Sequence, residues 1–222
     1  MKLAVLLLLL ATALMMSQES GTIFQDDFEN DLSKWDISEP DNIRLIDSGD
    51  PKHGQVMELT PGGEFVRALI KNSEGMNSYS IEADLLFPQK EHNYFGLIYN
   101  YQQAGERIDF GSIYIKGNGS YIRVNPRRDY NAHRTLYEEY KTPLVGEDAI
   151  EIGEWARFKA EVIDSTCHFY VGDMTNPKVT FDLFELKSGR IGFKPRVVGG
   201  AFWLDNVRVS SILRFSYQGP MQ

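Results

Sequence analysis

Short stretches of alternating apolar and polar residues recur along this chain, and turn-forming residues separate them. In the clearest stretch, residues 79–87, every second side chain is apolar over the first seven positions, as a half-buried strand requires. Roughly a dozen such stretches follow one another at the spacing typical of a β-sandwich or jelly roll. No window shows helical periodicity over three turns. The pattern predicts an all-β fold, a two-sheet antiparallel β-sandwich.

The stretch 189–210 carries the strongest version of this pattern. Ile191 and Phe193 alternate with polar or small neighbours, and the pair Gly199-Gly200 supplies residues suited to a tight turn. We therefore expect two strands around a turn. Asp205 interrupts the second apolar run. A carboxylate in such a strand must be solvated, paired or bound to a cation.

Length and charge restrict the classes of protein that this chain can be. Its 222 residues, 42% of them hydrophobic, suit one large β domain. A net charge of −8 argues against nucleic acid and anionic membrane surfaces as partners. The single cysteine, Cys167, excludes an intrachain disulfide, and its place in an alternating stretch predicts a buried small hydrophobe.

The first residues are typical of an export signal. Lys2 precedes an apolar run, residues 3–16, that is too short to span a bilayer but suits the core of a signal peptide. We expect residues 1–17 to be removed, leaving a secreted or periplasmic domain over 18–222 with its core at about 22–212. No later run is long enough for a transmembrane helix, and we expect a monomer that is not an integral membrane protein.

The order of several short motifs resembles a known superfamily. These motifs are Asp-Asp-Phe-Glu to Trp (26–35), Gly-x-Val-x-x-Leu (54–59), Phe-Gly-Leu (95–97), Glu-Trp-x-x-Phe (154–158) and Gly-Arg-Ile-Gly-Phe to Leu-Asp-Asn-Val-Arg-Val (189–209). In this order they resemble the concanavalin A-like lectin/glucanase superfamily, including its laminin-G-like, family 16 glucanase-like and 3-keto-disaccharide hydrolase-like members. The resemblance implies a jelly roll of two curved sheets whose concave face binds glycans.

Family 16 glucanases also carry a calcium site on the convex side, and three positions match it. They are Asp27, the carbonyl of Gly54, and Asp205. Calcium prefers several hard oxygen ligands and accepts both carboxylates and carbonyls, so the match implies a structural calcium ion. The alternatives for Asp205 are hydrogen bonds to nearby N–H groups or an ion pair with an arginine.

The catalytic motif of retaining glucanases, Glu-x-Asp-x-x-Glu on one strand, is absent from the sequence. Glu82 and Asp84 share a strand face but lack a third carboxylate. Glu138 and Glu139, in a polar Tyr-rich stretch expected to be a long loop (126–143), could line a cleft. An enzyme with other acid/base residues, a glycoside hydrolase or polysaccharide lyase, therefore remains the alternative.

A binding face follows from the alternation if Leu97, Ile113, Ile122 and Val124 point into the core. The polar and aromatic residues between them then share the opposite face, where tyrosine rings can stack on sugars and Asn or Arg can bond hydroxyls. The predicted ligand-binding residues are Tyr94, Asn100, Tyr114, Tyr121, Arg123 and Asn125. The sequence thus predicts a secreted carbohydrate-binding, lectin-like module. A structural domain with no small ligand is a third interpretation.

Overall fold

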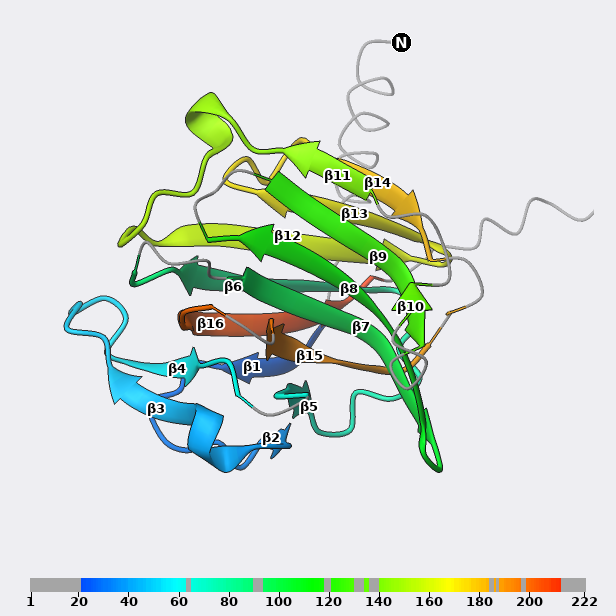
Figure 1. The fold of residues 1–222 in the computed structure, drawn as a ribbon, viewed down its shortest axis with the longest axis horizontal. Coiled ribbons are helices and arrows are strands. Elements are labelled where there is room, and N and C mark those ends of the chain that lie inside the picture. Colours follow the sequence, from blue (N-terminus) through cyan, green and yellow to red (C-terminus); the bar gives the residue numbers. More distant parts are fainter. Residues whose placement is uncertain are drawn as a thin grey trace, which may run out of the picture.

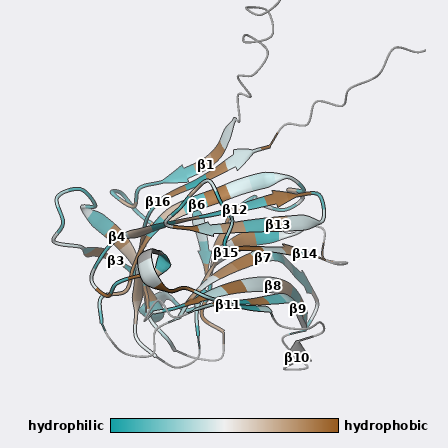
Figure 2. Cartoon of the chain, turned by 90° about the horizontal axis from the view of Figure 1, so that it is seen from above, coloured by the Kyte–Doolittle hydropathy of each residue, from teal (hydrophilic) through white to brown (hydrophobic). Residues whose placement is uncertain are grey.

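The computed structural model describes residues 21–62, 65–89, 94–117, 121–129, 134–135, 140–183, 186, 188–196 and 199–212. Within these residues two antiparallel sheets of eight strands each form two layers (Figures 1 and 2). The helical elements in this part of the chain are two single 3-10 turns, η2 (Pro40–Asn42) and η3 (Gly146–Asp148). No helix in the described ranges is long and apolar enough to cross a bilayer. The prediction of an all-β, two-sheet sandwich is confirmed.

Sheet A contains the first and last strands of the described residues. Its spatial order is β14 (Val179–Asp182), β13 (Thr166–Val171), β12 (Ala156–Ile163), β6 (Tyr79–Leu86), β16 (Phe202–Ser211), β4 (Gln55–Leu59) and β3 (Ile43–Asp47), with β1 (Thr22–Asp26) also paired to β16. The β1–β16 pairing sets Thr22 opposite Ser210. The two ends of the domain are therefore joined by backbone hydrogen bonds.

Sheet B contains the longest strand of the described residues. Its spatial order is β10 (Arg134–Thr135), β9 (Tyr121–Asp129), β8 (Arg107–Lys116), β7 (Tyr94–Ala104), β15 (Arg190–Pro195), β5 (Ala68–Ile70) and β2 (Trp35–Ile37), with β11 (Tyr140–Pro143) also paired to β9. Strands β7, β8 and β9 bend together along their length (Figure 1).

The apolar side of each alternating strand faces the other sheet. Strand β6 shows this plainly, because its side chains alternate between buried and partly buried from Tyr79 to Leu85. The four positions expected to point inward from sheet B are all buried: Leu97, Ile113, Ile122 and Val124. Cys167 is also fully buried, as predicted, and burial raises the pKa of its thiol.

The expected hairpin in the stretch 189–210 is wrong, although both of its strands exist. Strand β15 pairs with β5 and β7 in sheet B, whereas β16 pairs with β1, β4 and β6 in sheet A. Phe193 and Leu204 consequently reach the same core from opposite layers. Two strands that each have one apolar face and are joined by a glycine pair can form a hairpin in one sheet. They can equally lie in different sheets, with the connection crossing between the layers.

The expected long loop over 126–143 is also partly wrong. Strand β9 continues to Asp129, and β11 returns along it with Tyr140 opposite Val124. The polar, Tyr-rich composition that predicts a loop does not exclude strands, and Pro143 lies at the end of an edge strand, where a missing N–H is tolerated.

Candidate functional site

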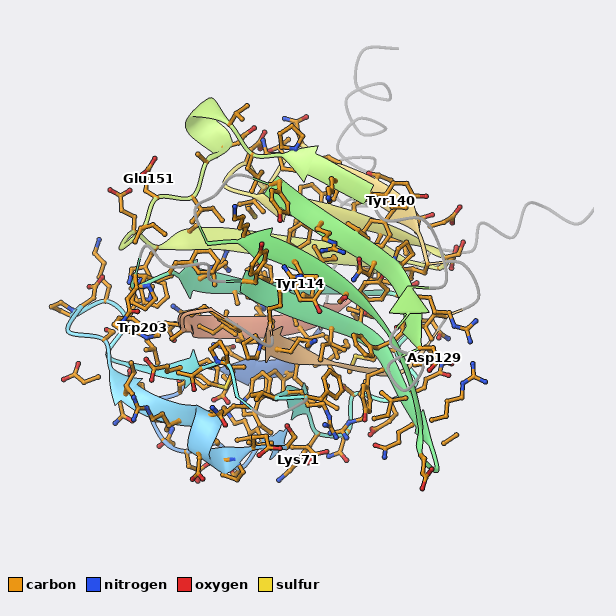
Figure 3. The ribbon with its side chains drawn as sticks, in the orientation of Figure 1. Lys71, Tyr114, Asp129, Tyr140, Glu151 and Trp203 are labelled. Atoms are coloured by element: carbon orange, nitrogen blue, oxygen red, sulfur yellow. The ribbon has the colours of Figure 1, made fainter. Side chains whose placement is uncertain are left out.

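The outer face of sheet B, which points away from sheet A, holds the predicted ligand-binding residues. They come from three neighbouring strands: Tyr94 and Asn100 on β7, Tyr114 on β8, and Tyr121, Arg123 and Asn125 on β9. Tyr114 lies in the middle of the sheet that faces the viewer in Figure 3. Five of the six follow the alternation. Asn100 instead lies in a β-bulge with a φ of 53°, and its amide donates to the carbonyl of Leu186.

Exposure divides these six residues into two groups. Tyr94, Tyr121 and Arg123 are partly exposed, at the end of the face where β7 begins and β8 ends. Tyr114, Asn125 and Asn100 are 6%, 1% and 0% exposed. A ligand arriving from solvent therefore meets the first group, while the second group lies deeper in the face.

The exposed end of the face is a tyrosine–cation cluster formed by Tyr94, Tyr121, Lys116 and Arg196. The two tyrosine hydroxyl oxygens lie 3.2 Å apart. The Arg196 guanidinium lies 4.8 Å from the centre of the Tyr94 ring, and the Lys116 ammonium lies 5.6 Å from that of Tyr121. Each ring thus has a cation within the range of a cation–π interaction.

The same cations act on the ionisation of Tyr94. Burial by itself would raise the pKa of this hydroxyl, but the hydrogen bond with Tyr121 and the charges of Arg196 and Lys116 bring the pKa below its ordinary value. The hydrogen bond with Tyr94 and burial raise the pKa of Tyr121. The two cations therefore favour negative charge on the Tyr94 oxygen, whereas Tyr121 holds its proton more tightly.

A second cation, Lys194, lies deeper on the same face. It is 6% exposed, and its ammonium donates to the Tyr114 hydroxyl at 3.0 Å. The rings of Phe65, Phe110 and Tyr114 surround it at 4.9 to 5.5 Å. Gly96 makes this possible, because a Cβ there would lie 2.9 Å from the Tyr114 ring and 2.7 Å from the Lys194 carbonyl oxygen.

Beside Tyr114, two polar atoms are buried without a hydrogen-bond partner among the described residues. They are Ser112 Oγ and Asn125 Oδ1, and their residues are directly paired across β8 and β9. The Oδ1 of Asn100 is a third such atom. Buried polar atoms are normally satisfied, and exceptions concentrate where a ligand or water completes the bonding.

The other half of the outer face is apolar. Phe65, from the segment between β4 and β5, stacks on Phe110 at 5.2 Å and on Tyr101 at 6.3 Å. With Leu69 and Ile98 these rings form a second small core outside the sheet. The accessible part of the face is therefore its tyrosine–cation end.

The three positions predicted to bind calcium lie on sheet A and in the turns beside it. Asp205 is 2% exposed; one of its oxygens accepts from the Asn206 backbone at 2.7 Å, and the other accepts from His53 Nδ1 at 2.8 Å. The Gly54 carbonyl accepts from Ser48 at 2.9 Å, and Asp27 is exposed. Burial raises the pKa of Asp205, and the hydrogen bond from His53 opposes this.

This arrangement matches the hydrogen-bonded alternative for Asp205. The oxygen donors are of the type that calcium prefers, but in this arrangement they do not fit an ion, because both oxygens of Asp205 already face nitrogen donors. No group of three or more His, Cys, Asp or Glu side chains among the described residues could hold a metal. Calcium binding would require His53, which stacks on Trp155 at 3.9 Å, to move away.

The carboxylates considered for catalysis are not arranged as an acid/base pair where they are described. Glu82 and Asp84 both bind Arg157, at 3.2 and 2.8 Å, on the outer face of sheet A. Glu138 and Glu139 lie outside the described residues. On the outer face of sheet B, pairing and alternation place one described strand carboxylate, Asp36, which binds Arg190 at 2.7 Å.

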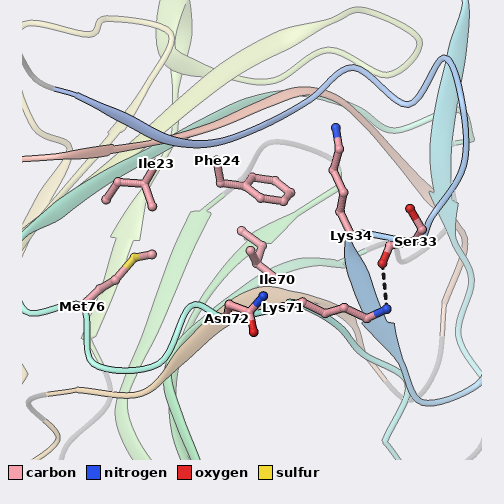
Figure 4. A pocket seen from close by; sticks show the side chains of 8 residues that line it. All are labelled: Ile23, Phe24, Ser33, Lys34, Ile70, Lys71, Asn72 and Met76. Atoms are coloured by element: carbon pink, nitrogen blue, oxygen red, sulfur yellow. Dashed lines mark hydrogen bonds between the residues drawn. The ribbon is translucent and has the colours of Figure 1, made fainter.

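A pocket of about 340 Å³ lies elsewhere, beside β1 and β5 (Figure 4). Its two lysines are already engaged: Lys71 donates to the Ser33 carbonyl at 2.7 Å, and Lys34 is paired with Asp26 at 3.0 Å. These contacts join the first strands to the sheet and leave no free ammonium for a ligand.

The sequence prediction missed the three basic residues of the site. Lys116 and Lys194 alternate with buried neighbours, and Arg196 continues the spacing of Lys194. Alternation alone could have assigned them to the outer face. Which strands lie next to one another could not be read from the sequence, because β15 was expected to pair with β16.

Comparison with solved structures identifies the architecture. The chain aligns with the Bacillus licheniformis beta-glucanase at 13% identity and a TM-score of 0.62, over 88% of this chain and 100% of that one. It aligns with a Bacillus subtilis protein of unknown function with a galectin-like fold at 11% identity and a TM-score of 0.61, over 89% and 99%.

It also aligns with the carbohydrate-binding module CBM66 from Bacillus subtilis, at 10% identity and a TM-score of 0.52, over 80% and 96%. This chain has the concanavalin A-like jelly-roll fold. The sequence matches no protein-family model and no curated protein. At these identities the likeness concerns the fold alone, and a shared fold does not fix function.

Proposed function

We propose that this chain is an exported, monomeric, non-catalytic carbohydrate-binding module that holds glycan on the outer face of sheet B. The observation that carries the proposal is the partly exposed pair Tyr94 and Tyr121, hydrogen-bonded to each other at the accessible end of that face. Tyrosine combines an apolar ring, which can stack on the C–H face of a sugar, with a hydroxyl that bonds sugar hydroxyls.

Two further observations support binding over hydrolysis. Retaining glycosidases need two carboxyl groups about 5 to 5.5 Å apart across the sugar. Within the described strands, the outer face of sheet B offers Asp36 alone, already paired with Arg190. The similar folds include a carbohydrate-binding module as well as glucanases.

A panel of immobilised polysaccharides tests the proposal. We expect retention on at least one glycan, and loss of that retention in Tyr94→Ala and Tyr121→Ala. Tyr140→Ala is the matched control, because Tyr140 is 39% exposed but pairs with Val124 and so points to the opposite side of the sheet. Retention on no glycan, or equal loss in the control, would refute the proposal.

The same panel tests the enzymatic alternative. Reducing-sugar release from any polysaccharide, abolished by Glu138→Gln or Glu139→Gln, would refute the non-catalytic module and show that the chain is a hydrolase. Sequencing the N-terminus of exported protein tests the predicted removal of residues 1–17, and light scattering tests the monomer.

A further inference from the structure

We propose that the tyrosine–cation cluster recognises an acidic saccharide, whose sugar rings carry carboxylate or sulfate groups. The inference rests on the proposed glycan-binding function and specifies the chemical class of the ligand. It starts from the charges of the outer face of sheet B, which differ from those of the rest of the molecule.

Three cations of this face have no carboxylate partner. Lys116, Lys194 and Arg196 make no ion pair among the described residues, where they contact aromatic rings and the Tyr114 hydroxyl. Lys141 adds a further positive charge at the edge, where it is exposed and opposite Arg123. The face is therefore positive in a chain whose net charge is −8.

Strand order brings these charges around the tyrosine pair. Tyr94 on β7 is directly opposite Lys116 on β8, while Lys194 and Arg196 belong to β15 and its continuation on the other side of β7. Strands are about 4.8 Å apart, so the cations flank Tyr94 across roughly 10 Å. A sugar stacked on the tyrosines would place acidic substituents on neighbouring rings within reach of both sides.

The buried ammonium of Lys194 has no carboxylate partner among the described residues, where its contacts are three aromatic rings and the Tyr114 hydroxyl. A buried charge costs stability unless it is paired, and elsewhere this chain pairs such charges. Asp109, which is similarly buried, binds both Arg107 and Arg127, at 2.8 and 3.0 Å. With 31 acidic residues available, the missing carboxylate beside Lys194 points to an anion that the ligand supplies.

The test compares polymers that differ in charge and in sugar content. The probes are polygalacturonate, a sulfated galactan, a neutral galactan and polyglutamate, each titrated by calorimetry into the full exported chain. We expect the acidic glycans to bind at least about tenfold more tightly than the neutral one, the difference that one charged hydrogen bond supplies. Raising the salt from about 0.1 to 1 M shortens the screening length from about 10 to 3 Å and should remove most of this advantage.

Charge-removing variants locate the effect. Lys116→Gln and Arg196→Gln should each weaken acidic-glycan binding about tenfold and change the melting temperature little, because neither side chain forms an ion pair among the described residues and each contacts only a partly exposed tyrosine ring. Lys52→Gln is the matched control: it removes the same charge from an exposed turn beside sheet A and should leave the affinity unaltered. Binding to one acidic glycan but not the other identifies its acidic group as carboxylate or sulfate and supports the inference.

The outcomes separate this inference from the proposed function. Equal affinity for neutral and acidic glycans, lost in Tyr94→Ala but not in Arg196→Gln, overturns the inference and leaves the glycan-binding module intact. Equal affinity for polyglutamate shows that charge rather than sugar is recognised and overturns both. Binding to none of the four polymers overturns the inference, and retention on the polysaccharide panel then decides the proposed function separately.

Discussion

Charged side chains on the outer faces of the two sheets have different kinds of partner. On sheet A, Arg157 binds Glu82 and Asp84, Lys159 binds Glu161 at 2.8 Å, and a network of donors surrounds the buried Asp205. On sheet B, the cations at the accessible end face aromatic rings. Both faces belong to the same sandwich and cover the same core.

This difference separates stabilisation from recognition. Charged side chains that form ion pairs within the fold contribute modestly to stability, and they are less available to bind a charged ligand. Charges left without partners reduce stability or contribute nothing to it, so folding does not account for their presence. This contrast supports the proposal that sheet B is the binding surface and sheet A its support.

The largest expected effect tests the support. Glu58, on the outer face of sheet A, accepts from Trp203 Nε1 at 2.9 Å and pairs with Arg44 at 2.8 Å. Its side chain is 10% exposed. Glu58→Leu leaves the indole N–H without its acceptor, and we expect the free energy of unfolding to fall by about 2 kcal/mol in urea denaturation.

Glu58→Gln is the control for this prediction. The amide oxygen keeps an acceptor for Trp203 while the charge is lost, so the variant should lose no more than about half as much stability. Equal losses in the two variants would show that charge, and not the hydrogen bond, holds this part of the sheet.

The same measurement at Lys194 should have the opposite sign. Lys194→Met replaces a buried, unpaired ammonium with an apolar chain of similar length among three aromatic rings. We expect the free energy of unfolding to rise by about 1 kcal/mol, because exchanging buried charge for packed apolar atoms is neutral or stabilising. Acidic-glycan affinity should fall in the same variant. A loss of stability as large as that of Glu58→Leu would show that Lys194 is structural and that the two faces do not differ in this respect.

Calcium would make sheet A a ligand-binding surface too, and calorimetry with calcium or EDTA tests this proposal. Any ion must displace His53 from Asp205. Calcium binding would raise the melting temperature, by the equivalent of about 0.4 kcal/mol at a concentration equal to its Kd. The rise should be larger in His53→Ala, where the competing donor is removed. An unchanged melting temperature in both proteins would eliminate calcium and leave the hydrogen-bonded state of Asp205.

The sequence was sufficient to predict the layers of this fold and the inward face of its strands. Burial imposes a period of two, so Leu97 and Val124 could be placed in the core from alternation alone. Strand neighbours could not be predicted in the same way. The sequence around Gly199-Gly200 is compatible with a hairpin and with a crossing between sheets, and pairing with distant strands decides between them.

For the candidate site, too, the sequence predicted which face a residue lies on but not which strands are neighbours. Alternation assigned Tyr94 and Tyr121 to one face, but their contact depends on β8 lying between their strands, with Tyr94 opposite Lys116. Alternation also treated Tyr114 and Asn125 as equivalent to the exposed pair. The burial of these two residues, and the place of Lys194 among aromatic rings contributed by two other segments, are consequences of tertiary packing.

The smallest expected effect is spectroscopic and concerns the tyrosine–cation cluster itself. Because the hydrogen bond with Tyr121 and the charges of Arg196 and Lys116 lower the pKa of Tyr94, this residue should ionise before the other tyrosines as the pH rises. Tyr121→Phe removes the hydrogen bond and Arg196→Gln removes a charge, so each should move that first step to higher pH in a titration of tyrosinate absorbance. Lys159→Gln, which changes the paired face of sheet A, should leave the step in place. A first step that neither cluster variant moves would show that these cations do not act on Tyr94, and the electrostatic contrast between the two faces would lose its support.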